Sequence, residues 1–164
     1  MTKELLVYFV GEKQESILFL AVGLLAIGVA VWLWTTDHRF RLMALPLVVV
    51  ALMQMVVGFT IYARTDAQVQ SLSVLQTNEP VQFQVEEISR MQTVMTNFEI
   101  YKTIEILLLV FALTLIAFAS KSDAAVGIGL GLLVQAAFTL ALDLFAEARG
   151  EAYLNALTAF NPLN

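Results

Sequence analysis

Residues 86–119, EEISRMQTVMTNFEIYKTIEILLLVFALTLIAFA, begin as a polar segment and end as an apolar one, with no proline or glycine between. Such an uninterrupted stretch predicts one long helix. Its purely apolar part, residues 106–119, is too short to cross a bilayer core, which needs about 20 residues. Counting back from Ala119 moves the entry to about Ile100 and leaves Glu105 inside. We therefore expect a helix that starts in water and ends across a membrane.

The composition of the whole chain is that of a membrane protein. It has 164 residues, of which 59% are hydrophobic and 14% are charged, against about 45–50% and about 25% in soluble domains. Cysteine is absent and His38 is the only histidine, which excludes thiol chemistry and sites built from several histidines. The net charge of −5, without a basic cluster, argues against nucleic acid as a partner. We predict no cofactor, no bound metal and no catalytic residue.

Four apolar segments predict a single polytopic domain, with spans at residues 16–34, 42–62, 100–119 and 124–144. Each is close to the ~20 residues that cross ~30 Å of hydrocarbon. Ser16 is expected to cap the first span, and Tyr8 and Phe9 before it are expected at headgroup depth. The tail, residues 145–164, is expected to lie along the membrane surface.

The segment between the second and third spans, residues 65–99, is polar and rich in glutamine. Its strong helix breaker is the cluster Thr77-Asn78-Glu79-Pro80, and Pro80 suits the first turn of a new helix. We expect the second span to continue beyond the membrane, turn near Asn78 and return. The predicted fold is an all-α integral membrane protein, a four-helix bundle with an extramembrane helical hairpin. A disordered loop is the alternative for this segment.

The orientation follows from positive charges in the two tight loops between spans. Arg39, Arg41 and Lys121 lie there, and the positive-inside rule places such loops in the cytoplasm. Both termini and the extramembrane hairpin are then expected on the non-cytoplasmic side, in a membrane that we predict to be the bacterial inner membrane. His38, in the first of these loops, is expected to be solvated.

One candidate site collects polar groups at the entry of the third span and the exit of the fourth. Glu105 and Asp143 would supply carboxylates, because an ionisable group inside a span is costly and often functional. On a helical wheel, the third helix shows a polar ridge that descends toward Glu105 and lies opposite its methionines. The predicted ligand- or ion-binding residues are Glu105, Asp143, Gln135, Thr139, Arg90, Asn97, Tyr101 and Lys102.

The roles within this site are specific. Gln135 and Thr139 would give neutral hydrogen bonds, and Arg90 or Lys102 the counter-charge. The alternative is an ordinary interface in which Glu105 pairs with Lys102 and Asp143 meets water. A metal at Glu105, Asp143 and Glu147 would be Mg²⁺ or Ca²⁺, given oxygen ligands alone.

Other polar and small residues have structural interpretations. Gln54 and Gln135 are expected to form hydrogen bonds between helices, and Gly127 and Gly131 to allow close helix contact. Glu86, Glu87 and Arg90 are expected on an ordinary solvated helix face.

Three function classes remain open. The first is a non-enzymatic accessory protein that binds a membrane-protein partner, or a second copy, through residues 65–99. The second is an oligomeric ion or proton channel, or a small transporter, that uses Glu105 and Asp143. The third is a membrane-interface enzyme acting on a lipid or amphiphile near Tyr101. The lipid bilayer is a partner in all three.

Overall fold

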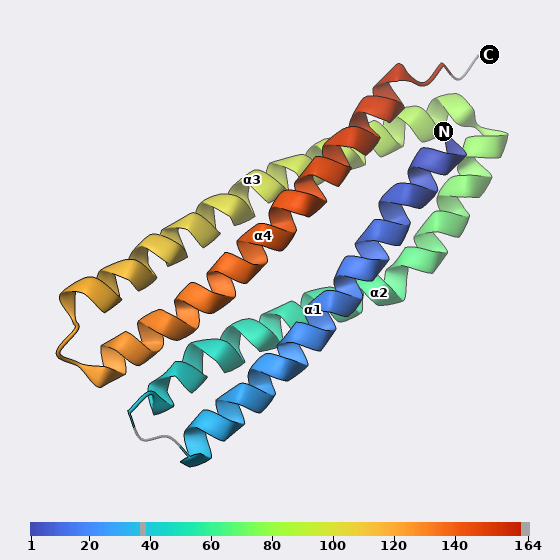
Figure 1. Ribbon diagram of the computed structural model, residues 1–164. Helices are drawn as coiled ribbons and strands as arrows, with labels where there is room; N and C mark the ends of the chain where they lie inside the picture. Colours follow the sequence, from blue (N-terminus) through green and yellow to red (C-terminus); the bar gives the residue numbers. More distant parts are fainter. Residues whose placement is uncertain (37–38, 162–164) are drawn as a thin grey trace.

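The computed structural model describes residues 1–36 and 39–161, and this part of the chain forms helices and short connections. The long helices are α1 (Thr2–Thr36), α2 (Ala44–Asn78), α3 (Pro80–Phe118) and α4 (Asp123–Ala159), and a short 3-10 helix, η1 (Arg41–Met43), precedes α2 (Figure 1). By length and composition, each long helix could cross a membrane. The prediction of an all-helical chain with four long apolar helices is confirmed. His38 lies outside the described residues.

The helices form two antiparallel hairpins, α1 with α2 and α3 with α4, which lie side by side (Figure 1). The start of α1, the end of α4 and the turn between α2 and α3 lie at the same end of the bundle. The helices contain 35, 35, 39 and 37 residues. At ~1.5 Å per residue each is about 50–60 Å long, so a bilayer core of ~30 Å would cover little more than half of it.

The turn between the hairpins occurs where the sequence predicts it. Glu79 leaves the helical conformation (φ −138°, ψ 66°), and its N–H donates to the carbonyl of Leu75 at 2.8 Å. Pro80 then occupies the first turn of α3, where its missing N–H has no helical partner to lose. From there α3 continues without a break to Phe118. The polar and apolar parts of residues 86–119 therefore belong to one helix, as expected.

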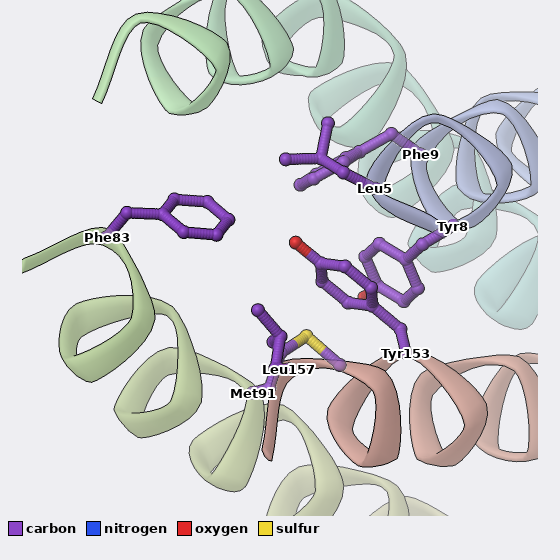
Figure 2. Close-up of a cluster of buried hydrophobic side chains, with 7 residues drawn as sticks. All are labelled: Leu5, Tyr8, Phe9, Phe83, Met91, Tyr153 and Leu157. Atoms are coloured by element: carbon purple, nitrogen blue, oxygen red, sulfur yellow. The ribbon is translucent and has the colours of Figure 1, made fainter. Parts of the chain in front are cut away.

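We call the end of the bundle that contains this turn the head. It comprises residues 2–11, 67–78, 80–98 and 150–161. Its core is made by Leu5, Tyr8 and Phe9 of α1, Phe83 and Met91 of α3, and Tyr153 and Leu157 of α4, whose side chains point toward one another (Figure 2). The rings of Tyr8 and Tyr153 stack with centroids 4.8 Å apart. Each large side chain buried here contributes about 1.5–3 kcal/mol, so all three helices are held firmly.

This packing corrects two expectations about the start of the chain. Tyr8 and Phe9 are 3% and 1% exposed, so they face other helices instead of lipid headgroups. Ser16 caps no helix, because α1 already starts at Thr2 and the Ser16 hydroxyl donates to the carbonyl of Lys13 at 2.7 Å. The reason is that Leu5, Tyr8 and Phe9 form an apolar face with helical spacing, which extends the helix toward the N-terminus.

The expectation of a surface-lying tail is also wrong for its described part. Helix α4 continues straight through Phe145 to Ala159, and it buries Tyr153 (2% exposed) and Leu157 (0%) in the head core. The hairpin of residues 65–99 is therefore not a lone two-helix stalk. It is half of a four-helix head whose other half comes from the two ends of the chain.

Close contact between the hairpins depends on two glycines at the other end of α4. A Cβ atom on Gly131 would lie 2.6 Å from Pro46 Cγ and 2.8 Å from the carbonyl oxygen of Met43. At Gly127 it would lie 3.3 Å from the backbone nitrogen of Met43. The predicted role of these glycines in close helix contact is confirmed, because a side chain at Gly131 would overlap the start of α2.

Candidate functional site

Ion pairs between helices form a layer just beyond the head. Lys13 pairs with Asp66 (2.6 Å), Arg64 with Glu12 (3.2 Å), Lys102 with Glu147 (2.6 Å) and Arg149 with Glu15. We call these eight residues the charged layer. Each pair joins two different helices, and together they connect α1 to α2, α1 to α4, and α3 to α4. Next to it lies the apolar half, namely residues 16–36, 44–62, 104–118 and 123–146.

Glu105 and Asp143 lie one helical turn into the apolar half from this layer. Glu105 of α3 is 8% exposed, and its Oε2 atom is buried without a hydrogen-bond partner. Asp143 of α4 is half-buried, and the charges that act on it are those of Glu105, Glu15 and Glu147. Within the described residues, neither carboxylate has a cation in salt-bridge contact. The Glu105 charge therefore acts on Asp143 of the neighbouring helix, and neither acid has a counter-charge in salt-bridge contact within the described residues.

Lys102, which was a candidate counter-charge for Glu105, forms an ion pair with Glu147. Lys102 Nζ donates to both carboxylate oxygens of Glu147, at 2.6 and 2.7 Å. The proposed Lys102–Glu105 pair is therefore wrong. Glu147 lies on the facing helix, so the Lys102–Glu147 pair joins α3 to α4.

Arg90 is also not a counter-charge for Glu105. It lies in the head, fifteen residues from Glu105 on the same helix, which is about 22 Å at ~1.5 Å per residue. Its Nε and NH2 atoms donate to the two carboxylate oxygens of Glu87, at 2.7 Å each. The guanidinium carbon lies 5.4 Å from the ring centroid of Phe9. Asn97 is half-buried between these levels, outside the acid pair.

Tyr101 lies at the surface of α3. It is 51% exposed, and it lines neither of two grooves found in the head. One groove lies at the turn, along residues 79–86, and the other between α1 and α4 beside Tyr8 and Tyr153. A substrate cleft near Tyr101, which an interfacial enzyme would need, is therefore not among these grooves.

The polar ridge predicted for α3 does not coincide with the buried face of this helix. Met91, Phe98, Glu105 and Ala112 recur every seven residues and are all buried or half-buried. A seven-residue repeat is the signature of helices that coil around one another. Glu105 therefore belongs to the methionine face of α3, and the Arg90–Asn97–Tyr101 ridge lies beside that face.

Gln135 and Gln54 form the predicted hydrogen bonds between helices. Gln54 Nε2 donates to Gln135 Oε1 at 3.4 Å, and Gln135 Nε2 donates to the carbonyl of Leu47 at 3.3 Å. Both side chains are buried, at 4% and 2% exposed. Gln135 thus faces α2 and not the acid pair.

Thr139 lies between the acidic residues and the glutamine pair. It lies beside Glu105, and its hydroxyl donates to the carbonyl of Gln135 at 3.0 Å.

The expected ligands for a metal do not come together. Glu147 is held by Lys102. Among residues 1–36 and 39–161, no three acidic or histidine side chains are arranged to hold a metal ion.

Glu87 is a buried, hydrogen-bonded carboxylate that the sequence alone did not identify. It was expected on a solvated face, but it is 1% exposed and receives hydrogen bonds from Arg90 and from the Tyr153 hydroxyl (3.1 Å). Burial and the Glu87 charge raise the pKa of Tyr153. Burial lowers the pKa of Arg90, but hydrogen bonds to Glu87 and its charge outweigh this and raise it overall. The available signal was the spacing of Phe83, Glu87 and Met91 at four-residue steps.

A comparison of the chain with protein-family models, with curated proteins and with solved structures finds no match. Its function is therefore inferred from the geometry of its own residues.

Proposed function

We propose that the chain is an integral membrane protein that binds a proton or a small monovalent cation between Glu105 of α3 and Asp143 of α4. The apolar half crosses the bilayer in this proposal, and the charged layer lies at the headgroups. The head then protrudes into water with both termini. Length supports this arrangement, because Glu15 to Trp34 is about 20 residues, or ~30 Å of helix.

The observation that carries the proposal is the contrast between these two acids and the neighbouring ion pairs. The eight side chains of the charged layer form four pairs of opposite sign. The charges that act on Asp143 are those of Glu105, Glu15 and Glu147, which are all acids, and Glu105 has the neutral Thr139 hydroxyl beside it. Two carboxylates that act on each other repel when both are ionised, so a proton or a cation bound between them would stabilise the pair. Their position inside a span makes an uncompensated pair more costly still.

Polar groups continue from the acids into the apolar half. Thr139 lies one turn from Asp143 on α4, and Gln135 lies one turn further, bonded to Gln54. A proton held at the acids therefore has the Thr139 hydroxyl beside it, and the Gln135 amide lies about two helical turns from Asp143 and faces α2. This arrangement favours the ion or proton pathway among the three classes considered.

The test uses purified protein in lipid vesicles and the infrared carbonyl band of protonated carboxylic acids. A pH jump should change this band in the wild type, and Glu105→Gln and Asp143→Asn should each remove the change. Glu99→Gln, at an exposed acid on the same helix, is the matched control and should keep it. Adding Na⁺ or K⁺ to the wild type separates the ligands, because a bound cation displaces the proton and reduces the band.

A wild-type band that is insensitive to pH and to salt contradicts the proposal. So does a pH-dependent band that survives both substitutions. Size-exclusion elution identical to wild type establishes that each variant is folded, and both substitutions keep the size and shape of the side chain.

Partner binding by the head is the second candidate function. Val81 and Val85 are 52% and 66% exposed beside the turn, and they line a groove with Glu79, Pro80, Gln82 and Glu86. Because Phe83 is fully buried, deleting this segment would unfold the head. Val81→Asp with Val85→Asp is a cleaner change, and it should reduce co-purification of a membrane partner without changing protein yield. Unchanged co-purification contradicts this candidate.

The orientation proposed from the tight loops has its own test. Arg39 pairs with Asp123 at 2.8 Å, so the two loops meet at the end that we place in the cytoplasm. A reporter enzyme that is active only outside the cytoplasm should be active when it is fused after Asn164. A reporter that is active only in the cytoplasm should be inactive there, and activity of that reporter would reverse the proposed orientation.

A further inference from the structure

One face of α1 has no partner within the chain, although it follows a regular pattern. Ten positions at alternating four- and three-residue steps are all exposed: Lys3, Val7, Val10, Gln14, Ile17, Ala21, Leu24, Gly28, Val31 and Thr35. We call them the α1 seam. The outward faces of α2 and α3 repeat in the same way, so the composition of the seam is what distinguishes it. The seam runs for about 48 Å at ~1.5 Å per residue.

Gly28 gives the first indication that the seam meets another helix. The chain has eight glycines, and Gly28 is the one at which an added Cβ would meet nothing within 4 Å. The other glycines allow close approaches inside the chain, so Gly28 has no such role in the isolated chain. Gly28 and Ala21 are seven residues apart on the seam, where small residues let a neighbouring helix approach closely.

The seam also crosses the proposed membrane boundary. Val7 and Val10 are 59% and 54% exposed in the head, which the proposed placement puts in water, where lipid cannot cover them. Ile17 and Leu24 are 50% and 61% exposed in the apolar half. A partner that covers all four must itself be a long helix that leaves the membrane at the same level.

The chemistry of the seam favours a second copy of this chain. From Val7 to Thr35 the seam has no charged residue, because Glu12, Lys13 and Glu15 turn toward α2 and α4 in ion pairs. Its polar member at the level of the charged layer is Gln14. An amide both donates and accepts hydrogen bonds, so Gln14 complements Gln14 of an identical helix. Two copies in one membrane have the same orientation, so their α1 helices run parallel about a two-fold axis.

We propose that this protein forms a parallel homodimer through the α1 seam. This goes beyond the proposed ion site, which lies on α3 and α4. It also differs from an interface at residues 65–99.

The absence of cysteine permits a clean cross-linking test on the full chain in native membranes. Val10→Cys, Ala21→Cys and Leu24→Cys place single thiols on the seam. Leu25→Cys on α1 and Leu107→Cys on α3 are controls at exposed positions (68% and 63%) off the seam. On oxidation, seam variants should form a species of twice 18.1 kDa, and the controls should form at least about ten-fold less of it.

Equal cross-linking at seam and control positions overturns the proposal, as does its absence at the seam. A cross-linked product of a different mass, which indicates another protein on this face, also overturns it.

Gly28→Leu provides an independent measurement. Because nothing in the chain lies near this position, the variant should fold normally yet self-associate roughly ten-fold more weakly or worse, as fluorescence energy transfer in vesicles would measure. Undiminished association of a folded variant contradicts a packed seam. Glu105→Gln should dimerise like the wild type, so failure of the ion site and failure of the dimer are distinguishable.

Discussion

At the scale of single residues, some acidic side chains of this protein have a cationic partner and others have none in salt-bridge contact. Glu87 and Arg90 form a buried, bidentate pair that Tyr153 completes. Glu105 has a buried oxygen without any partner. The same chemical group on the same helix therefore has two different roles, and the difference lies in what the facing helices provide.

Removing the Glu87 charge should destabilise the head. Glu87→Gln leaves Arg90 without its anionic partner among aromatic rings, and breaking a buried ion pair in this way costs about 3 kcal/mol. Glu86→Gln, at the exposed neighbouring acid, should change stability by less than about 0.5 kcal/mol. Denaturant unfolding in detergent, followed by tyrosine fluorescence, measures both. Equal effects of the two substitutions would show that the Glu87 pair contributes nothing specific.

Alkaline pH should loosen the head through its buried tyrosines. Burial, with the charge of Glu12, raises the pKa of Tyr8 to about 12. Since an unfolded tyrosine loses its proton near pH 10, the unfolded state gains stability between pH 10 and 12 while Tyr8 in the folded head stays neutral. This contribution is fully present below pH 10 and is lost as the pH approaches 12. Tyr8→Phe should flatten the fall in melting temperature over this interval, and an unchanged slope contradicts the assignment.

At the scale of elements, two kinds of contact hold the hairpins together in the apolar half. Glycines allow the start of α2 to approach α4, and one amide pair joins α2 to α4 at Gln54 and Gln135. Both depend on the apolar setting. In the proposed membrane placement, helices gain little from hydrophobic burial against each other, so close packing and hydrogen bonds determine their association.

Gly131→Ala should weaken this contact more than Gly127→Ala. The new Cβ would meet Pro46 Cγ at 2.6 Å and a backbone oxygen at 2.8 Å, whereas at Gly127 the nearest atom would be 3.3 Å away. Overpacking of this kind costs about 1–3 kcal/mol, so Gly131→Ala should lower the melting temperature and Gly127→Ala should lower it less. A reversed order would mean that α4 and α2 are further apart than described.

The amide pair should behave cooperatively in a double-mutant cycle. Gln135→Leu removes hydrogen bonds to Gln54 and to the Leu47 carbonyl, at a cost of roughly 0.6–1.7 kcal/mol. Adding Gln54→Leu should cost less than Gln54→Leu alone, because its partner is already gone. Strictly additive effects in thermal unfolding would indicate that the two amides do not interact.

At the scale of the whole molecule, the head and the apolar half are parts of the same four helices. The two ends of the chain, which the sequence suggests are peripheral, supply most of the head core (Figure 2). The charged layer ties all four helices together at the junction.

Truncating a core side chain near the C-terminus should disturb the whole head. Leu157 is fully buried, and Leu157→Ala should cost about 2–5 kcal/mol through lost burial and a new cavity. Hydrogen exchange should then accelerate in residues 2–11 and 80–98 as well as in α4, while the apolar half keeps its protection. Thr158→Ala, at the exposed neighbour, is the control. Exchange that accelerates in α4 alone would mean that the end of α4 is not part of the core.

The sequence by itself determined the helices, the turn at Glu79 and Pro80, the unbroken α3, the glycine contacts and the glutamine pair. These follow from composition, helix breakers and residue size, which act over a few neighbouring residues. The sequence also predicts that Glu105 and Asp143 lie at the same level, since they occupy neighbouring antiparallel helices.

Only the tertiary structure decided which face of each helix is buried and which charges are partners. Lys102 pairs with Glu147 on another helix. Tyr153, near the end of the chain, donates a hydrogen bond to Glu87 and stacks on Tyr8. A small rotation of a coiled helix moves a residue from the exposed face to the buried one, and a wheel drawn at 100° per residue does not include this rotation. Partner choice depends on distances between segments far apart in sequence, and those distances exist only once the four helices have packed.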